Sequence, residues 1–258
     1  MRMLQILLAA PLEGHGWGMP HDASLDGWRI DDLINETSAF VILLFAIMVA
    51  WMLWAAVRHG ERHPARFDHG TSRRSIAVAL SIAAAIFFVV DGHLFLNSIV
   101  VWKQVFGNFA WAEAQPGAVR IEINAHQWAW VARYAGADGK FGTQDDIVVP
   151  QGLPVLFQVA SIDVIHSFNI PNMRMKIDAV PGMINRVWFT AKETGQFDIG
   201  CAQHCGANHY KMRGTLTVLP REEWERWAGV ASANSARAYD PEDKDAQWAW
   251  DWEKHARI

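Results

Sequence analysis

The sequence predicts an α+β membrane protein, in which an N-terminal two-helix transmembrane hairpin precedes a β-rich domain and a short helical C-terminal tail. Two long apolar stretches flank an arginine-rich connector, and a series of short β-type runs follows them. Of the 258 residues, 51% are hydrophobic and only 19% are charged, which is more apolar than a water-soluble protein requires. We therefore predict four regions: an extracytoplasmic segment at 1–34, the hairpin at 35–104, the β domain at 105–220 and the tail at 221–258.

The two apolar stretches have the lengths expected of membrane-spanning helices. Residues 38–57 contain no charge, and about 20 apolar residues cross the hydrocarbon core as a helix. Residues 75–90 are also uncharged but slightly short, so the second span is expected to continue past Asp91 toward residue 102. A carboxylate at this position should face protein or the membrane interface, and not lipid. Asp91 and His93 fit either a proton route or, as we favour, the membrane surface.

The connector between the spans predicts the orientation of the chain. Residues 58–74 hold five arginines against Glu61 and Asp68, and short loops rich in Arg and Lys lie on the cytoplasmic side. Both termini and the β domain are then expected on the periplasmic side of a bacterial-type inner membrane. Residues 1–11 look like a short signal sequence, with one positive charge before an apolar core.

The β-rich region consists of short runs separated by turn-forming Gly, Pro, Asp and Asn. Strands are expected at residues 119–125, 128–134, 146–150, 154–161, 166–171, 184–190, 195–200 and 213–220. Many short strands at close spacing indicate a Greek-key sandwich or barrel. Residues 136–146 slightly resemble a calcium loop, but their spacing does not match the EF-hand pattern, so a plain hairpin loop is favoured.

The most informative motif is a set of soft metal ligands in residues 201–212. Cys201 and Cys205 are four residues apart, His209 follows four residues later, and Met212 comes three residues after that. Thiolate, imidazole and thioether together favour copper over harder ions. A disulfide and a redox-active CxxxC pair are the alternatives. The disulfide would leave the spacing of His209 and Met212 unexplained, and redox pairs are usually CxxC, so the whole set favours copper.

A two-copper site with two thiolates needs a second imidazole from outside this loop. A lone histidine in a β-rich segment is usually a half-buried structural residue, but His166 is here the best candidate for that ligand. His204 lies between the two cysteines, where its side chain is expected to point away from the cluster. His126 is a weaker candidate.

These residues together resemble subunit II of cytochrome c oxidase, in the haem–copper oxidase family. The resemblance rests on the CxxxCxxxHxxM motif at 201–212, the DVxHSF motif at 163–168, the HQWAW run at 126–130 and the two preceding spans. Residues 173–182 also look like the family's LGLKxDAxPG stretch, and the whole resemblance covers about residues 24–220.

The resemblance implies a cupredoxin-like Greek-key β-barrel that holds a dinuclear, mixed-valence CuA centre. Two thiolates would bridge both copper ions, each imidazole would bind one ion, and a thioether and a backbone carbonyl would be weak axial ligands. The bridging thiolates would come from Cys201 and Cys205, and the imidazoles from His166 and His209. The weak axial ligands would be the thioether of Met212 and the backbone carbonyl of Gln203.

The resemblance also assigns a role to one aromatic residue. Trp128 matches the tryptophan through which electrons enter from reduced cytochrome c. From spacing alone, Trp128 and Trp130 would be read as strand residues that are packed or at the membrane surface. In a regular strand the two side chains would face the same side.

The function implied by the resemblance is that of the electron-entry subunit of a respiratory oxidase. Such a subunit accepts electrons from cytochrome c or a similar periplasmic donor and passes them to haem in subunit I, where oxygen is reduced to water and protons are pumped. Its partners would be subunit I, other oxidase subunits and membrane lipid. The CuA subunit of a nitric oxide reductase and a membrane-tethered copper carrier are the alternatives. A net charge of −4 with no basic block argues against nucleic acid as a partner.

Three features depart from the family pattern. Gln203 replaces a glutamate that helps to hold magnesium at the contact with subunit I, and an amide binds Mg²⁺ more weakly, so a magnesium site is doubtful. Residues 71–75 lack the glutamate found at a proton-channel mouth, and Met183 replaces an arginine. Residues 111–220 hold nine basic and nine acidic side chains, which leaves the electron donor open. The acids that could form a local docking patch are Asp145, Asp146, Asp163 and Asp178.

Overall fold

The computed structural model describes residues 19–60, 63–64, 67, 69–136, 139–144 and 146–238. The chain divides into two compact units, a helical hairpin at residues 29–104 and a β domain formed by the residues before and after it. Several predicted features lie outside the described residues: the signal-like start, part of the connector (Glu61, Arg62, Arg66 and Asp68), Asp145, and the tail from residue 239 onward.

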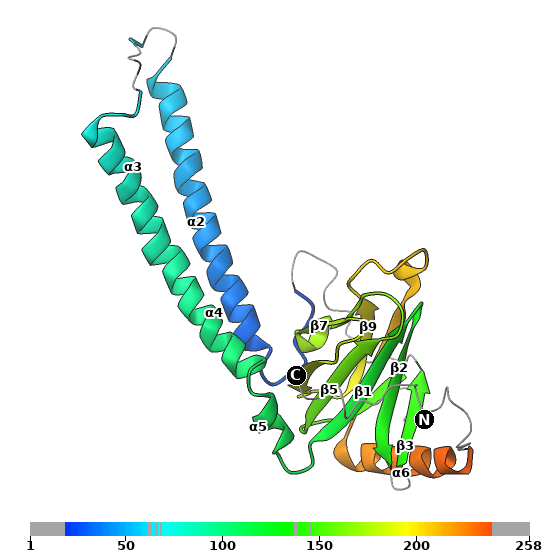
Figure 1. The fold of residues 1–258 in the computed structure, drawn as a ribbon. Coiled ribbons are helices and arrows are strands. Elements are labelled where there is room, and N and C mark those ends of the chain that lie inside the picture. Colours follow the sequence, from blue (N-terminus) through cyan, green and yellow to red (C-terminus); the bar gives the residue numbers. More distant parts are fainter. Residues whose placement is uncertain are drawn as a thin grey trace. The chain divides into compact units, whose positions relative to one another are not determined.

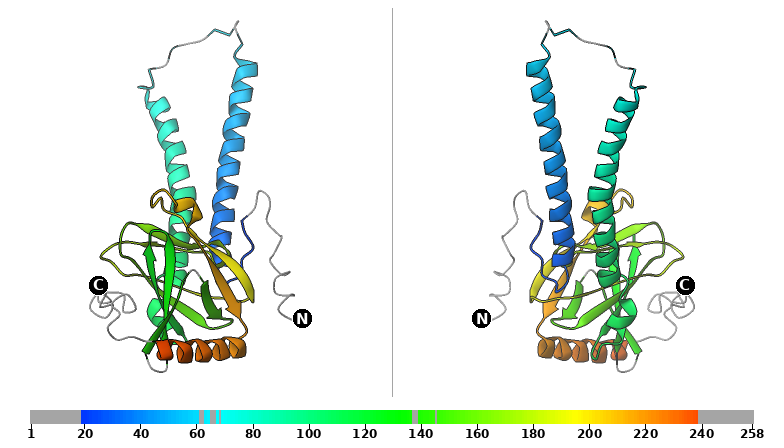
Figure 2. Two further views of the ribbon diagram at one scale, coloured as in Figure 1. Left: turned by 90° about the vertical axis from the view of Figure 1, so that its right-hand side faces the viewer. Right: turned by 90° about the vertical axis from the view of Figure 1, so that its left-hand side faces the viewer.

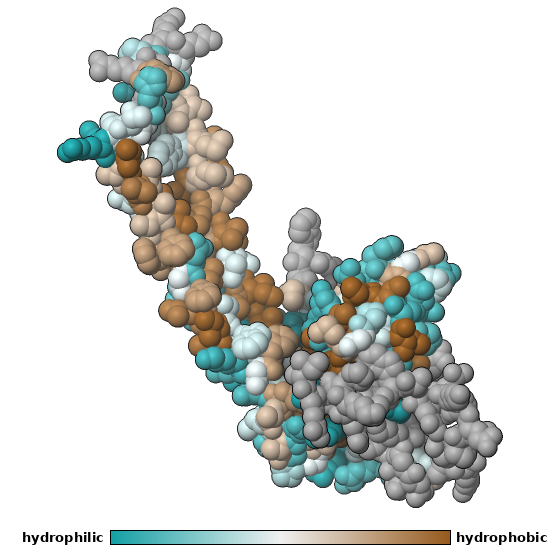
Figure 3. All heavy atoms as spheres, in the orientation of Figure 1, coloured by the Kyte–Doolittle hydropathy of each residue, from teal (hydrophilic) through white to brown (hydrophobic). Residues whose placement is uncertain are grey.

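Two long helical segments form the hairpin (Figures 1 and 2). α2 (Trp28–Arg58) is continuous, whereas α3 (Arg73–Ala85) runs through a π-helical turn, η1 (Ile86–Asp91), into α4 (Gly92–Val105). Both segments are long and apolar enough to cross a membrane, and none of their residues is buried. Apolar side chains dominate the hairpin surface that faces the viewer in Figure 3. Such a surface is unfavourable in water, which confirms the two predicted transmembrane helices.

Polar contacts join the two segments of the hairpin at one end. Glu36 of α2 accepts a hydrogen bond from Asn97 Nδ2 at 2.9 Å and contacts His93 Nε2 at 2.5 Å. Near the same end, Arg29 donates to Gln104 Oε1 at 3.0 Å. His93 therefore lies against α2, where it links the two helices.

The β domain consists of two five-stranded sheets. The first has the order β3-β2-β1-β5-β8 and the second the order β4-β10-β9-β6-β7. The strands are β1 (Val119–His126), β2 (Ala129–Gly136), β3 (Gly139–Gln144), β4 (Asp146–Pro150), β5 (Pro154–Ser161), β6 (His166–Ile170), β7 (Met175–Ala179), β8 (Asn185–Thr190), β9 (Gly195–Cys201) and β10 (Arg213–Leu219). Most neighbours are antiparallel, but β1 pairs with β5, and β10 with β4, in parallel.

Two strands of the domain, β3 and β7, were not predicted, and β2 begins one residue later than predicted. β3 lies inside the predicted hairpin loop and pairs with β2, and β7 pairs with β6. β2 begins at Ala129, so Trp128 belongs to the turn before it and not to a strand. The expectation that Trp128 and Trp130 share one side therefore does not apply.

The hydrophobic core is formed by side chains of both sheets. Phe157 of β5 and Phe168 of β6 are fully buried, with ring centroids 5.6 Å apart, and Phe157 also stacks on Phe189 of β8. A second, smaller cluster joins Leu156 and Trp188 to Ala112 of the short helix α5 (Phe109–Glu113). Because β5 contributes to both clusters, it is buried on both faces, which explains why its residues form a continuous apolar run.

Residues before the hairpin also belong to the β domain. Ser24 forms an isolated bridge with Ala191, and the backbone N–H groups of Ala23 and Leu25 donate to Asn172 and Thr190, each at 2.8 Å. The start of α2 at Trp28 therefore follows directly from a segment that is hydrogen-bonded to this domain.

The first half of the tail packs against the β domain. α6 (Arg221–Ala238) lies along one end of the β domain, where it contacts β2, β3 and β4 (Figure 2). Its Trp224 and Trp227 pack against the core. The rings of Trp227 and Tyr134 lie 5.4 Å apart, and the Tyr134 hydroxyl accepts a hydrogen bond from Val148 N at 2.8 Å. The tryptophans of α6 thus stabilise their own domain.

We expect Trp227→Ala to lower the free energy of unfolding of the β domain by about 2 kcal/mol. Replacing a fully buried tryptophan with alanine costs about 3–5 kcal/mol of stability. Trp227 is only partly buried, so its replacement should cost less. Urea denaturation followed by tryptophan fluorescence measures the change. Val230→Ala is the control, because Val230 is 63% exposed on the same helix and should cost much less. Equal effects of the two substitutions would contradict the packing role of Trp227.

Candidate metal centre

The loop between β9 and β10 carries four of the predicted ligand side chains. Cys201 ends β9, Cys205 lies in the loop, His209 starts the short 3-10 helix η3 (His209–Lys211), and Met212 precedes β10. β9 and β10 pair in antiparallel fashion, and Cys201 N donates to Met212 O at 3.2 Å. The two strands therefore hold both ends of the loop in place.

The fifth side chain comes from the neighbouring strand. His166 begins β6, and β6 pairs with β9 so that Phe168 lies opposite Cys201. His166 is fully buried, and its Nδ1 lies 3.1 Å from Met212 Sδ. The sheet thus brings together two segments that are more than thirty residues apart in the sequence.

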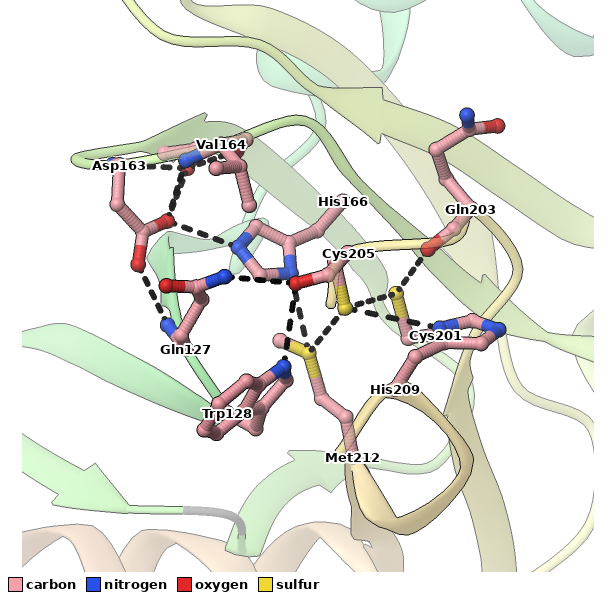
Figure 4. A network of polar contacts seen from close by, with 11 residues as sticks. Gln127, Trp128, Asp163, Val164, His166, Cys201, Gln203, Cys205, His209 and Met212 are labelled. Atoms are coloured by element: carbon pink, nitrogen blue, oxygen red, sulfur yellow. Dashed lines mark hydrogen bonds and ion pairs between the residues drawn. The ribbon is translucent and has the colours of Figure 1, made fainter. Parts of the chain in front are cut away.

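The sulfur and nitrogen atoms of these side chains converge on one point (Figure 4). Both cysteines are free, with their sulfurs 3.8 Å apart, far beyond the bond length of about 2.05 Å of a disulfide. Ligand atoms of His166, Cys201 and Cys205 all lie within 4.8 Å of one another. Cys205 Sγ is also 3.6 Å from His209 Nδ1 and 3.8 Å from Met212 Sδ.

The other three candidate metal ligands lie in different places relative to this cluster of sulfur and nitrogen atoms. The backbone carbonyl of Gln203 lies 3.1 Å from Cys201 Sγ, while the Gln203 side chain points away from the cluster (Figure 4). His204 is exposed, and its ring packs against that of His209 with centroids 5.5 Å apart. His126, half-buried at the end of β1, is not part of the group of ligand atoms that the described residues form.

Asp163 holds the buried imidazole of His166 in position. Its Oδ1 lies 2.9 Å from His166 Nε2, which leaves Nδ1 facing the sulfurs. The same carboxylate accepts backbone hydrogen bonds from Val164 and Gln127, each at 2.6 Å. Burial would raise the pKa of the Asp163 carboxyl, but the hydrogen bonds from His166, Val164 and Gln127 outweigh it and hold the pKa below its usual value.

The turn between β1 and β2 directly contacts the loop between β9 and β10, which carries Cys205. Gln127 Nε2 and Trp128 Nε1 both donate to the backbone carbonyl of Cys205, at 2.8 and 3.1 Å. Trp128 is half-buried beside the loop, whereas Trp130 is fully buried in the core with its ring 6.1 Å from that of His166. The two tryptophans therefore have different environments.

Sequence reasoning did not assign metal-site roles to Asp163 or Gln127. The spacing of Asp163, three residues before His166, was a usable signal, because ligand histidines usually pass their second N–H to a carboxylate. Gln127 had no local signal, since its contact with Cys205 joins residues from two different sheets.

The donor atoms fit copper. Two thiols, two imidazoles and a thioether form a soft set that suits copper better than magnesium or calcium. Burial and the adjacent Cys201 raise the pKa of the Cys205 thiol to about 12 in the metal-free protein. A metal ion bound here would have to displace that proton, because the thiolate is the ligand form.

We expect Asp163→Asn to lower the stability of the copper-free β domain by about 1–2 kcal/mol at neutral pH, because charge-assisted hydrogen bonds are lost. Since the folded-state pKa lies below the unfolded value of about 3.9, the stabilisation is present above that value and is lost as pH falls through the folded pKa. Urea denaturation between pH 7 and pH 3 should show the two proteins converging at acidic pH.

The control for this substitution is Asp198→Asn. Asp198 also pairs with a basic side chain, Arg213, but its side chain is 78% exposed, so its replacement should change stability little. A constant difference between wild type and Asp163→Asn at every pH would contradict the role assigned to the carboxylate.

The fold and the site together define a class of protein: a two-sheet β domain that follows an apolar helical hairpin and carries a set of soft candidate metal ligands from one loop and the neighbouring strand β6. Residues 135–218 match the family described as cytochrome c oxidase subunit II, periplasmic domain. The alternative cytochrome c oxidase subunit 2 of Bradyrhizobium diazoefficiens is 28% identical over 241 residues, covering 80% of this chain and 84% of that protein. The cytochrome c oxidase subunit 2 of Alkalihalophilus pseudofirmus is 30% identical over 217 residues, covering 80% of this chain and 59% of that protein.

Among solved structures, the periplasmic domain of subunit II of cytochrome oxidase of Bradyrhizobium japonicum is 31% identical, with a TM-score of 0.43 over 45% of this chain and 94% of that one. The family match over residues 135–218 and the curated relatives all carry the name of cytochrome c oxidase subunit II, which confirms the resemblance seen in the sequence. The match to the periplasmic domain and the two long apolar helices confirm the predicted fold class, a transmembrane hairpin followed by a cupredoxin-like β domain.

Proposed function

We propose that this chain is the electron-entry subunit of a respiratory terminal oxidase. It accepts electrons from cytochrome c or a similar periplasmic donor at a dinuclear copper centre. It passes them to haem in subunit I, where oxygen is reduced to water and protons are pumped. Subunit I and other oxidase subunits are its partners in the membrane.

One observation carries this proposal: two unbonded cysteine sulfurs lie 3.8 Å apart, and the buried imidazole of His166 lies within 4.8 Å of both. The residues that would hold the two copper ions are Cys201, Cys205, His166, His209, Met212 and, through its carbonyl, Gln203. A pair of copper ions that share one unpaired electron supplies one-electron transfer with little structural change. A carrier would need exchangeable ligands, and an enclosed set spread over two segments does not favour that use.

The protein's own contribution is to orient the ligands and to provide a contact for the donor. Asp163 fixes the His166 ring by accepting from Nε2, which keeps Nδ1 directed at the sulfurs. Trp128 is half-buried, and its indole N–H donates to the carbonyl of Cys205. This contact supports the proposal that electrons enter through Trp128, because a hydrogen-bonded route joins the ring to a ligand residue.

The proposed sidedness is supported by the connector and by the residues that precede the hairpin. The arginines of the connector favour the cytoplasm for the loop between α2 and α3. Ser24 is bridged to Ala191 only a few residues before α2 begins, which supports placing the first helix's start on the same side as the β domain. Both arguments support a periplasmic metal centre and periplasmic termini.

The proposal is tested by loading the full chain, purified in detergent, with copper. Metal analysis should give two copper ions per chain, and electron paramagnetic resonance should show one unpaired spin coupled equally to both nuclei. A spin coupled to a single copper, or a bond between Cys201 and Cys205 in the folded protein, would overturn it. Purification of the native complex then identifies the large subunit. Cytochrome-dependent oxygen uptake supports the oxidase, whereas reduction of nitric oxide alone would replace it with a nitric oxide reductase.

A further inference from the structure

A groove of about 560 Å³ runs between the two segments of the hairpin. Its apolar wall includes Phe87 of η1 and Phe95 of α4. The groove also contains Thr37 of α2 and Gly92 and Ser98 of α4, which are small residues. Small residues are typical of surfaces where transmembrane helices approach each other closely, because they let the backbones come near.

The hydroxyl groups in this groove are already satisfied within their own helices. Thr37 Oγ1 donates to Leu33 O at 2.7 Å, and Ser98 Oγ donates to Phe95 O at 2.8 Å. They therefore do not require a polar partner. Gly92 presents only backbone, and a Cβ added there would already lie 3.4 Å from the Phe87 carbonyl at the π-helical turn. The turn and the glycine leave room for a neighbouring backbone.

Asp91 also lines the groove, but its polar group differs from the hydroxyl groups in its hydrogen bonding. It is the last residue of η1 and is exposed, and within the described part of the chain no side chain or backbone group pairs with its carboxylate. Glu36, on the facing helix, is by contrast held by His93 and Asn97. The hairpin thus satisfies one of these two carboxylates and leaves the other available.

The depth of Asp91 makes this unpaired carboxylate costly. His93 contacts Glu36, which lies just before the charge-free run at residues 38–57. Asp91 is two residues nearer the connector, or about 3 Å deeper along the helix. It therefore lies at the edge of the hydrocarbon, where an ionisable side chain almost always faces a partner that satisfies it.

We propose that this groove receives a transmembrane helix of another oxidase subunit, and that an Arg or Lys near one end of that helix pairs with Asp91. The small residues provide the close approach, and the carboxylate supplies the charge that selects the partner. A long basic side chain can reach Asp91 from the interface, because Lys and Arg extend along apolar surface. The identity of the partner as an oxidase subunit rests on the proposed function, whereas the pairing with Asp91 does not depend on whether the metal centre contains copper.

Site-specific photocrosslinking in the intact membrane tests the proposal. The photoreactive amino acid p-benzoylphenylalanine is introduced at Phe95, which lines the groove, or at Leu96, the next residue, which is 63% exposed and does not line it. The crosslinked peptides are then identified by mass spectrometry. We expect the position-95 probe to capture one transmembrane peptide with an Arg or Lys at the depth of Asp91, and the position-96 probe to capture other neighbours.

Substitution of the carboxylate provides the second arm. Asp91→Asn should lower the crosslinking yield at position 95 at least about fivefold and leave the yield at position 96 unchanged. If both yields fall, the two charges are exchanged to separate loss of the pairing from loss of the fold. Asp91→Arg, combined with Asp at the basic position of the captured helix, should then restore the crosslink at position 95. Capture of lipid, of a second copy of this chain, or of a helix without a basic residue at that depth would overturn the proposal. An unchanged yield in Asp91→Asn, or failure of the exchange to restore it, would overturn it as well.

Discussion

Replacing Cys205 with serine is expected to abolish the proposed dinuclear copper centre while leaving the β domain folded. Cys205 lies at the middle of the donor set, with Cys201, His209 and Met212 all within 3.8 Å of its sulfur. A serine hydroxyl has nearly the same shape but is a hard donor that keeps its proton, so it cannot act as a bridging thiolate. Loss of a residue that only supports a ligand already costs about 10–100-fold in metal affinity, and loss of this ligand should cost at least about 100-fold.

Copper titration of the full chain, with electron paramagnetic resonance of the loaded protein, measures the effect of Cys205→Ser. Under the proposed function, oxidation of cytochrome c by the assembled complex should also fall at least about 100-fold, because electrons would lose their entry point. His204→Ala is the matched control, because His204 lies in the same loop but is exposed and only packs against the His209 ring. The control should retain two copper ions. A Cys205→Ser protein that still binds two copper ions with one shared spin would remove the basis of the proposed function.

The parts of the molecule that were predictable from the sequence are those whose signals are local. The charge-free run at residues 38–57 predicts a helix by length alone, and the candidate ligands of residues 201–212 follow one another on a single loop. His166 required only one long-range inference, that a second imidazole must come from elsewhere in the chain. The pairing of β6 with β9 then explains how it reaches the cysteines.

Other features depend on which strands meet in space, and no local pattern encodes that. The short β-type run at residues 128–134 predicts a strand that includes Trp128, yet Trp128 lies in a turn that contacts the loop of the opposite sheet. β7 is short and half-exposed, so its pattern is weak without its partner β6. The contact of His93 with Glu36 likewise joins two helices whose register only the folded hairpin defines.

The contact between the Trp128 turn and the ligand loop predicts a strong effect at Gly206. This residue has a φ of +117°, and a Cβ placed on it would lie 2.9 Å from Gln127 Nε2 and 3.2 Å from Trp128 Cζ2. Both atoms belong to side chains that donate to the carbonyl of Cys205, so they cannot move without losing those bonds. We expect Gly206→Val to destabilise the domain by about 2–3 kcal/mol, because it combines a strained backbone with a steric clash.

The same substitution should separate electron entry from metal binding. The candidate ligand atoms themselves remain in Gly206→Val, so copper binding should be retained. Under the proposed function, reduction by cytochrome c should slow at least about tenfold, because Trp128 would be displaced from the Cys205 carbonyl. Rapid-mixing reduction kinetics of the copper-loaded chain, with urea denaturation in parallel, measure both effects. Gly200→Ala is the control, since no atom lies within 4 Å of a Cβ built there. If Gly206→Val and Gly200→Ala were reduced at the same rate, the hydrogen bond from Trp128 to Cys205 would have no part in electron entry.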